Sequence, residues 1–236
     1  MSKKGGSVHK KRFNASKIMV LEKRKGHKWI IGTKAGPHNK DQSAPISVIL
    51  RDLLKIVKTN KETKKLIRDK KILIDGKPAK DYRLTVGLMD VISLPDQGKN
   101  YRLYLDKYRK LRAKEIDNEK AKIKLGKVVK KTKGKKDKII ITLHDGKTII
   151  GDNNIKTGDS LIISLEKNKI NKILKLENGV KCYIMKGKHT GQIGELKEIV
   201  QTESSKQKIV KLDVEGKEII TVAEYLFIVD DNWVNE

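Results

Sequence analysis

The sequence has few of the residues that cross-link a chain or stack on a flat ligand. Its 236 residues include one cysteine, Cys182, and an aromatic share of only 4%. A single cysteine excludes an internal disulfide and a cysteine-rich metal site, and it fits a reducing compartment. So few aromatic rings argue against stacking as the main mode of ligand binding. No apolar run is long enough for a membrane span and no secretory signal is found, so we expect no membrane partner.

Acidic residues are also scarce, and their scarcity is local. The chain carries 55 Lys and Arg against 29 Asp and Glu, a formal net charge of +26. Residues 1–138 hold 41 of the basic and 14 of the acidic side chains, whereas residues 139–236 hold 14 and 15. A general preference for Lys would spread the excess over the whole chain. The localised excess predicts that residues 1–138 bind a nucleic acid, because each neutralised phosphate releases a counterion.

Arrangements of catalytic or metal-binding residues are missing as well. The five histidines form no His-Glu-x-x-His pair, and none is paired with a spaced cysteine. His144 and Asp145 are adjacent at an expected turn, and neighbours on a strand point to opposite faces, so they make a poor acid–base pair. No nucleophile elbow, dinucleotide fingerprint or Gly-Lys-Ser/Thr phosphate loop is found. We therefore predict that the protein is not an enzyme and needs no cofactor or metal.

Residues 1–42 resemble an irregular basic arm, with a short strand near Trp29. Such an arm orders between RNA helices or stays a solvated tail, and charge alone does not separate the two. Its basic clusters are candidate RNA contacts: Lys10, Lys11, Arg12, Lys23, Arg24 and Lys25.

Residues 43–105 predict two short helices on a small sheet. Apolar residues at helical spacing predict a first helix from Pro45 to Val57. Thr59-Asn60-Lys61-Glu62 is a capping box that begins a second helix. Strands are expected at Ile72–Ile74 and Val91–Leu94. The cations of this segment either straddle an RNA backbone or form a solvated face, with about equal support: Arg51, Lys55, Lys64, Lys65, Arg68 and Lys71.

Residues 106–138 are expected to form a basic connector, helical near Glu119–Lys122 and looped at Lys130–Lys136. From Ile139 onward, short strands between turns predict two small barrels, or one barrel and a smaller one. The stretch 186–196 follows a strand and contains three glycines, which permit positive φ and close backbone approach. It is either an RNA-facing loop or an ordinary hairpin. Its candidate residues are Lys186, Lys188 and His189 at the tip and Gly187, Gly191 and Gly194 in the backbone.

Several motifs, spread over nearly the whole chain, together resemble one family. They are His9-Lys10-Lys11-Arg12, Gly36-Pro37-His38, the run Gly-Leu-Met-Asp-Val-Ile at 87–92, and His144-Asp145. The glycine stretch is similar to the KOW motif. The chain therefore resembles the S-four-e family of small-subunit ribosomal proteins of archaea and eukaryotes. It departs from that family at Ser16 and Met19, where a proline and an aromatic residue are usual.

The resemblance implies an α+β, multi-domain protein that is a non-enzymatic constituent of the small ribosomal subunit. It implies a cytoplasmic monomer within the ribosome that binds small-subunit rRNA and touches neighbouring ribosomal proteins. The chain ends soon after Trp233 without a basic tail, which suits an archaeal member. The implied domains are a basic arm at 1–42, an alpha-L type RNA-binding domain at 43–105, a central β domain with the connector at 106–174, and an SH3-like KOW barrel at 175–236.

Two other functions compete with this interpretation. One is a KOW-containing transcription- or translation-associated factor, which the Gly-Leu-Met-Asp segment at 87–90 disfavours. The other is an RNA-modifying enzyme that holds its substrate with an alpha-L domain. The short strands after residue 139 leave no room for a separate catalytic domain, so this second alternative is also disfavoured.

Overall fold

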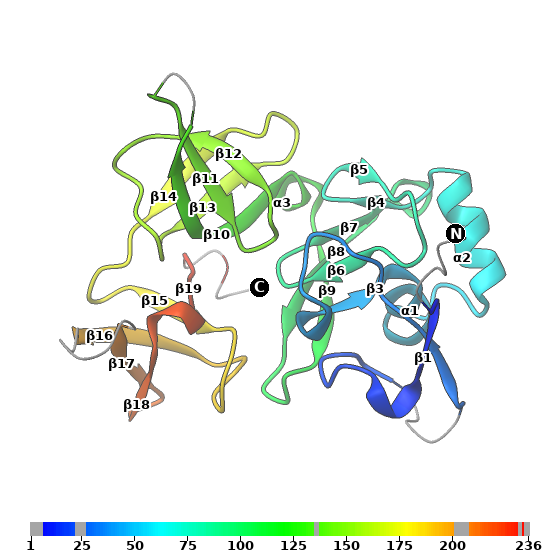
Figure 1. Cartoon of the computed structure of the whole chain (residues 1–236), viewed down its shortest axis with the longest axis horizontal. Helices are drawn as coiled ribbons and strands as arrows, with labels where there is room; N and C mark the ends of the chain where they lie inside the picture. The colour runs from blue at the N-terminus through cyan, green and yellow to red at the C-terminus, as the bar shows by residue number, and fades with distance from the viewer. Residues whose placement is uncertain (1–6, 22–26, 135–136, 201–207, 231–232, 234–236) are drawn as a thin grey trace, which may run out of the picture. The chain divides into compact units, whose positions relative to one another are not determined.

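The computed structural model describes residues 7–21, 27–134, 137–200, 208–230 and 233 (Figure 1). The chain forms two compact units, Met1–Tyr104 with Lys110–Ala121 and Leu105–Arg109 with Lys122–Glu236. Regular structure is mostly antiparallel strand with a few helices. The expected combination of helices and sheets is thus confirmed, with strands dominant. Among the described residues, no helix is long and apolar enough to cross a membrane.

The segment predicted to be an irregular arm contains paired strands. β1 (His9–Lys11) pairs antiparallel with β2 (Trp29–Ile31), which confirms the short strand expected near Trp29. The 3-10 helix η1 (Arg12–Asn14) lies between these strands in the chain, and a second one, η2 (Lys40–Gln42), follows β2. The arm is more regular than its high charge predicted, because some of its apolar side chains are buried. These buried side chains are Ile18, Met19, Ile30 and Ile31.

The first helical segment of this unit ends earlier than predicted. It begins as α1 (Ile46–Val48) and continues as the π-helical turn η3 (Ile49–Leu53), not as an α-helix to Val57. The Leu54 N–H donates to the Ile49 carbonyl, and Lys55 adopts a φ of +55°. A left-handed residue stops a right-handed helix, so the apolar spacing beyond Leu53 belongs to a turn.

The second helix, α2 (Asn60–Arg68), confirms the capping box. Thr59 Oγ1 accepts a hydrogen bond from the Glu62 N–H at 3.3 Å. The Glu62 carboxylate accepts one from the Lys58 N–H at 2.9 Å, and this bond lowers the pKa of Glu62. These contacts satisfy donors at the start of the helix that would otherwise lack partners.

The sheets of the first unit are antiparallel. One has the strand order β5-β4-β7-β8-β9, and a two-stranded sheet pairs β3 with β6. The strands are β3 (Ser43–Pro45), β4 (Leu73–Ile74), β5 (Lys77–Pro78), β6 (Thr85–Gly87), β7 (Val91–Leu94), β8 (Lys99–Leu105) and β9 (Leu111–Ile116). The largest fully buried side chains of this unit are Ile46, Ile49, Leu50, Ile72, Ile92, Leu103 and Leu111.

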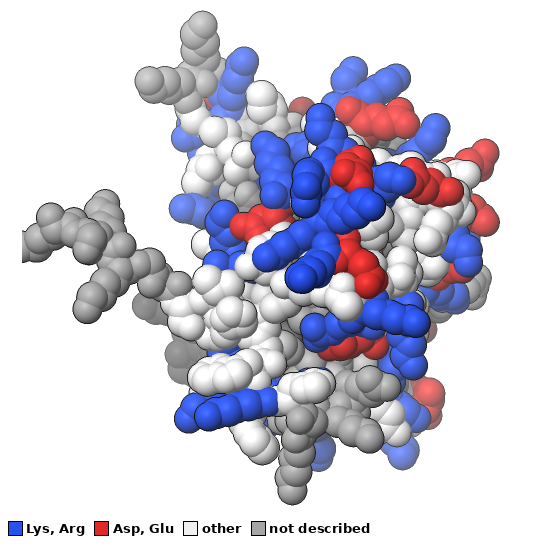
Figure 2. Space-filling model, turned by 90° about the vertical axis from the view of Figure 1, so that its right-hand side faces the viewer, with Lys and Arg blue, Asp and Glu red and all other residues white. Residues whose placement is uncertain are grey.

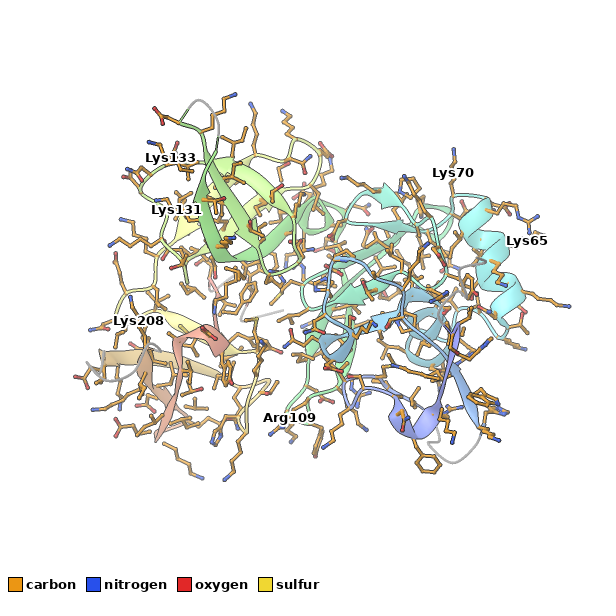
Figure 3. The ribbon with its side chains drawn as sticks, viewed as in Figure 1. Lys65, Lys70, Arg109, Lys131, Lys133 and Lys208 are labelled. Atoms are coloured by element: carbon orange, nitrogen blue, oxygen red, sulfur yellow. The ribbon has the colours of Figure 1, made fainter. Side chains whose placement is uncertain are left out.

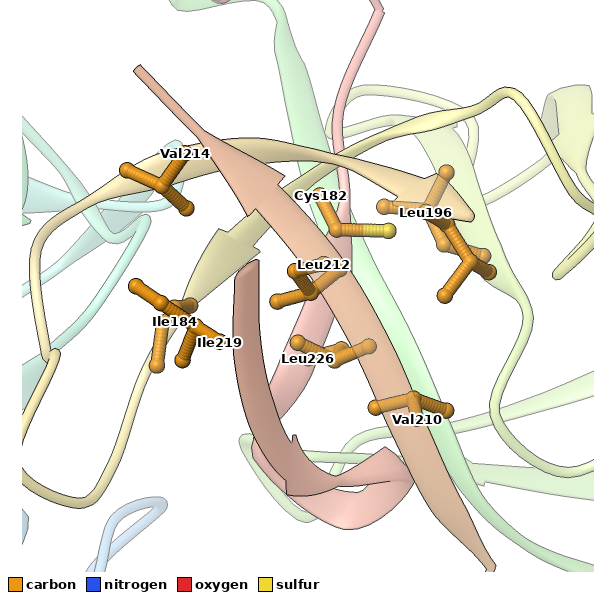
Figure 4. Packing of buried hydrophobic residues seen from close by; sticks show 9 residues of the cluster. Cys182, Ile184, Leu196, Val210, Leu212, Val214, Ile219 and Leu226 are labelled. Carbon is orange, nitrogen blue, oxygen red and sulfur yellow. The ribbon is translucent and has the colours of Figure 1, made fainter. Parts of the chain in front are cut away.

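The second unit contains two five-stranded antiparallel sheets. The first has the order β12-β11-β10-β13-β14 and the second β18-β17-β16-β15-β19. The first comprises β10 (Ile123–Lys133), β11 (Ile139–Leu143), β12 (Thr148–Gly151), β13 (Ser160–Ser164) and β14 (Ile170–Leu174). The second comprises β15 (Lys181–Ile184), β16 (Ile193–Val200), β17 (Ile209–Val214), β18 (Lys217–Val222) and β19 (Leu226–Ile228). Each sheet has its own apolar core, and Figure 4 shows that of the second.

The basic connector is mostly strand, which corrects the sequence prediction. Its helical turn is confirmed as α3 (Asn118–Ala121), but β10 then runs through Lys130–Lys133, where a loop was expected. The Lys133 end of β10 pairs with Ile139 of β11. A strand satisfies its backbone through the ladder without burying every side chain, so a charged run is compatible with it.

Candidate nucleic-acid interface

Helix α2 has one buried side and one basic side. Thr63 and Ile67 are buried, and the cations lie at i, i+3, i+4 and i+7 on the other side. Figure 2 shows Lys and Arg gathered on the face that includes α2, with acidic residues between them. In Figure 3 the side chains of Lys65 and Lys70 point away from the ribbon. The exposed cations of the helix are Lys61, Lys64, Lys65 and Arg68.

The other predicted cations of this unit differ in how far an acidic neighbour offsets their charge. Arg51 donates to both carboxylate oxygens of Asp52, at 2.7 and 3.0 Å, and this contact raises the pKa of its guanidinium. Lys71 Nζ lies 2.6 Å from Asp96, which raises the pKa of Lys71. Lys55 is exposed beyond the end of η3. Arg51 and Lys71 therefore contribute less free positive charge than the α2 cations.

Lys64 differs from its neighbours on α2 because an aromatic ring holds it. Its Nζ lies 4.6 Å from the centroid of the Tyr82 ring. Attraction between an ammonium group and the ring face positions Lys64 without neutralising it. Lys65 and Arg68 have no acidic partner among the described residues, so they project as free cations. The helix thus presents one positioned cation beside two that are free to adapt to a ligand.

Two of the sequence motifs meet in the buried interior of the first unit. His38 Nε2 lies 2.8 Å from Asp90 Oδ2, and both side chains are buried. The same oxygen accepts a hydrogen bond from the Gly87 N–H at 2.8 Å. A Cβ at position 87 would lie 2.7 Å from the His38 ring, so glycine is required there. This His38–Gly87–Asp90 cluster is structural: it joins the Gly-Pro-His turn to the strands that carry the next motif.

The arm residues are placed unequally. Lys11 is exposed, Lys10 is half-buried, and desolvation lowers the pKa of Lys10. Arg12 is only 6% exposed, and its buried Nε has no hydrogen-bond partner among the described residues. Its guanidinium is covered by the folded segment, so we leave Arg12 out of the interface. The predicted contacts Lys23, Arg24 and Lys25 lie outside the described residues.

Comparison with known proteins shows to which family the chain belongs. The chain is 40% identical over 214 residues to the small ribosomal subunit protein eS4 of Nanoarchaeum equitans, covering 91% of each chain. It is 37% identical over 229 residues to the eS4 of Methanosphaera stadtmanae, covering 97% of this chain and 95% of the relative. The chain belongs to the ribosomal S4e family. The resemblance inferred from its motifs is therefore confirmed.

Family models and a solved structure agree with this membership. The model described as "Ribosomal family S4e" matches residues 97–170, and the S4 domain model matches residues 48–92. The S4 domain match includes all of α2. The crystal structure of the 30S ribosomal protein S4e from Thermoplasma acidophilum aligns with a TM-score of 0.70 and 32% identity, covering 80% of this chain and 96% of that one.

The glycine stretch of this S4e chain is a loop over residues 186–192, followed by the first residues of β16. Lys186 and Lys188 are exposed and His189 is half-buried. The loop's other predicted residues have structural roles. Gly187 and Gly191 adopt φ values of +92° and +85°, which favour glycine. A Cβ at Gly194 would lie 2.5 Å from Val214 Cγ2, so that glycine permits close strand packing.

The charged half of β10 adds cations that our candidate residues omitted. Lys131 Nζ donates to the Asn153 carbonyl at 2.7 Å, and Lys133 pairs with Asp137 at 2.8 Å. Lys130 is exposed on the same strand. Figure 3 marks Lys131 and Lys133 along β10. The sequence shows that these residues are charged. It does not show where their side chains point, because we expected a loop there and a loop does not fix side-chain directions.

Cys182 is a core residue of this S4e chain. It is fully buried in the second sheet, and burial raises its pKa to about 12. The reactive thiolate is therefore scarce at neutral pH. We expect iodoacetamide at pH 8 to leave the folded protein unlabelled and to add one label per chain in guanidinium, as read by mass spectrometry. Rapid labelling without denaturant would show that this core opens easily.

Proposed function

We propose that this S4e-family chain is a structural constituent of the small ribosomal subunit that binds and stabilises the subunit's rRNA. The basic face of α2 carries the proposal. It is exposed and largely unneutralised, and it lies within the segment that matches the S4 domain model. The family relationship supports the same role, because the relatives are named as small ribosomal subunit proteins. The chain acts without catalysis, in the cytoplasm, as one copy among neighbouring ribosomal proteins.

The proposed interface has a primary and a secondary part. The primary part is the α2 face with Lys55, where cations neutralise phosphates and the helix reads the shape of the RNA. Arg51 and Lys71 contribute less, because Asp52 and Asp96 offset their positive charge. The secondary part consists of two groups of residues, one in each unit: Lys10 and Lys11 in the arm of the first unit, and Lys186, Lys188 and His189 in the glycine loop of the second unit. Salt should weaken binding through both parts, since each releases counterions.

The domain boundaries are part of the proposal. We assign residues 43–105 to an alpha-L type RNA-binding domain, 106–174 to a central β domain and 175–236 to an SH3-like KOW barrel. The five antiparallel strands β15–β19, which close over one apolar core, support the last assignment. The three positions where glycine is needed in the 186–196 loop support the KOW assignment.

Sedimentation of cell extracts tests the proposed function. We expect the protein to cosediment with small subunits at one copy per particle and to remain there at moderate salt. A transcription factor would instead follow polymerase, and a modifying enzyme would appear in substoichiometric amounts. Quantitative mass spectrometry of gradient fractions provides the measurement. A chain found mainly in the fractions free of ribosomes would contradict the proposal.

A further inference from the structure

An exposed tyrosine stands at the tip of the turn that joins β8 to β9. The segment Leu105–Arg109 belongs to the second unit. The Tyr108 side chain is 68% exposed, the largest exposure of any large hydrophobic residue among those described. It lies between two exposed cations, Lys107 and Arg109, and Lys107 Nζ lies 5.5 Å from the ring centroid. Figure 3 marks Arg109 at this tip.

Hydrogen bonds fix the shape of the turn in spite of its exposure. The Tyr108 N–H donates to Asp106 Oδ1 at 2.8 Å, and the Arg109 N–H donates to the Asp106 carbonyl at 2.9 Å. Arg109 closes the turn with a φ of +59°. Tyr183, which is buried, fixes the base of the turn: its hydroxyl accepts from the Leu105 N–H at 2.9 Å and donates to the Leu105 carbonyl at 2.5 Å.

The glycine loop supports the same turn from the side. A Cβ at Gly191 would lie 2.5 Å from the Asp106 carbonyl oxygen and 2.8 Å from the Lys107 nitrogen. Only glycine allows the two backbones to approach this closely. The requirement at Gly191 is therefore explained by contact with this turn. The glycine loop and the turn that carries Tyr108 thus pack against one another within the second unit.

The chemistry of an exposed aromatic ring between two cations favours a flat partner that carries phosphates. Burying it against another surface is favourable, and its flat faces suit another flat ring. The flanking Lys107 and Arg109 disfavour an apolar or basic protein partner and favour phosphates on either side. A base-paired helix does not offer a free base face, whereas an unpaired nucleotide offers both a base to stack and adjacent phosphates.

We propose that Tyr108 stacks on an unpaired base of the RNA while Lys107 and Arg109 contact the phosphates beside it. This inference rests on the proposed function and specifies the kind of RNA element that the second unit binds. One rigid ring suits one base, which agrees with the low aromatic content of the chain.

The test compares three variants of the full chain binding to a small-subunit rRNA transcript. Tyr108→Ala should weaken binding roughly 5- to 150-fold, the range for losing one base–aromatic stack. Tyr108→Phe keeps the ring and should bind within about twofold of the unaltered chain. Ile220→Ala removes an equally exposed apolar side chain, 67% exposed, from the same unit and should have no effect. The salt dependence of Tyr108→Ala should match that of the unaltered chain, because stacking releases no counterions.

Chemical probing of the same transcript identifies the element. A base that is reactive in the free RNA should be protected by the unaltered chain and by Tyr108→Phe but not by Tyr108→Ala. Equal affinity and equal protection for Tyr108→Ala and the unaltered chain would overturn this inference alone. Failure of the unaltered chain to bind the transcript would instead overturn the proposed function. Loss of affinity without any change at an unpaired base would assign Tyr108 to another contact and also overturn the inference.

Discussion

Reversing the charge of Lys64 and Lys65 should weaken rRNA binding on the order of tenfold to a hundredfold and flatten its salt dependence. Both side chains lie on the exposed face of α2, and each is expected to neutralise one phosphate. Removing two such contacts should reduce the slope of log K against log salt by about two. Glutamate is a good helix former, so Lys64→Glu with Lys65→Glu should leave α2 folded. Filter binding at several salt concentrations measures both quantities.

The matched control changes the net charge by the same amount elsewhere. Lys167 and Lys169 are exposed between β13 and β14, outside the proposed interface. Lys167→Glu with Lys169→Glu should lower affinity far less than the α2 pair and leave the salt slope nearly unchanged. Equal losses for the two double variants would mean that total charge, rather than the α2 face, drives binding. An unaltered affinity for the α2 variant would remove this helix from the interface.

The sequence predicted those helices and strands that depend on interactions between neighbouring residues. The capping box of Thr59 and Glu62 acts within one helical turn, so the start of α2 follows from four consecutive residues. Turn residues likewise predicted the series of short strands after Ile139. The first helix was predicted too long because apolar spacing does not report the left-handed Lys55 that ends it. The strand through Lys130–Lys133 was missed because its side chains are typical of a loop. Backbone pairing with β11 makes this segment a strand, and a single segment does not reveal its partner.

Contacts between residues far apart in the chain could not be predicted from the sequence. His38 and Asp90 are 52 residues apart, and Leu105 and Tyr183 are 78 apart. The motifs that contain His38 and Asp90 were visible, but no spacing rule connects positions so far apart. The candidate site was predicted only in part, and the reason is related. Charge composition identified the basic segments, yet it does not distinguish the exposed Lys65 from the buried Arg12, since burial depends on the apolar residues that fold around each cation.

Replacing Asp90 by alanine should destabilise the first unit by about 3 kcal/mol, the scale for removing one partner of a buried, hydrogen-bonded pair. The Asp90 carboxylate is buried and contacts both His38 Nε2 and the Gly87 N–H. Asp90→Ala leaves these two polar groups without that acceptor in the core. Urea unfolding, followed by hydrogen exchange of amides in β6 and β7, measures the loss. The second unit should keep its protection, because it is a compact unit that contains two apolar clusters of its own.

Asp96→Ala provides the control for this prediction, since Asp96 is an exposed carboxylate that pairs with Lys71 at the surface. A solvated pair contributes little, so the unfolding midpoint should scarcely move. If Asp90→Ala were no more destabilising than Asp96→Ala, the buried cluster would not hold the fold together. RNA binding separates this structural role from direct contact: at low temperature, where Asp90→Ala remains folded, its affinity should approach that of the unaltered chain. A large loss of affinity in a fully folded Asp90→Ala protein would instead mean that the cluster sets the geometry of the α2 surface.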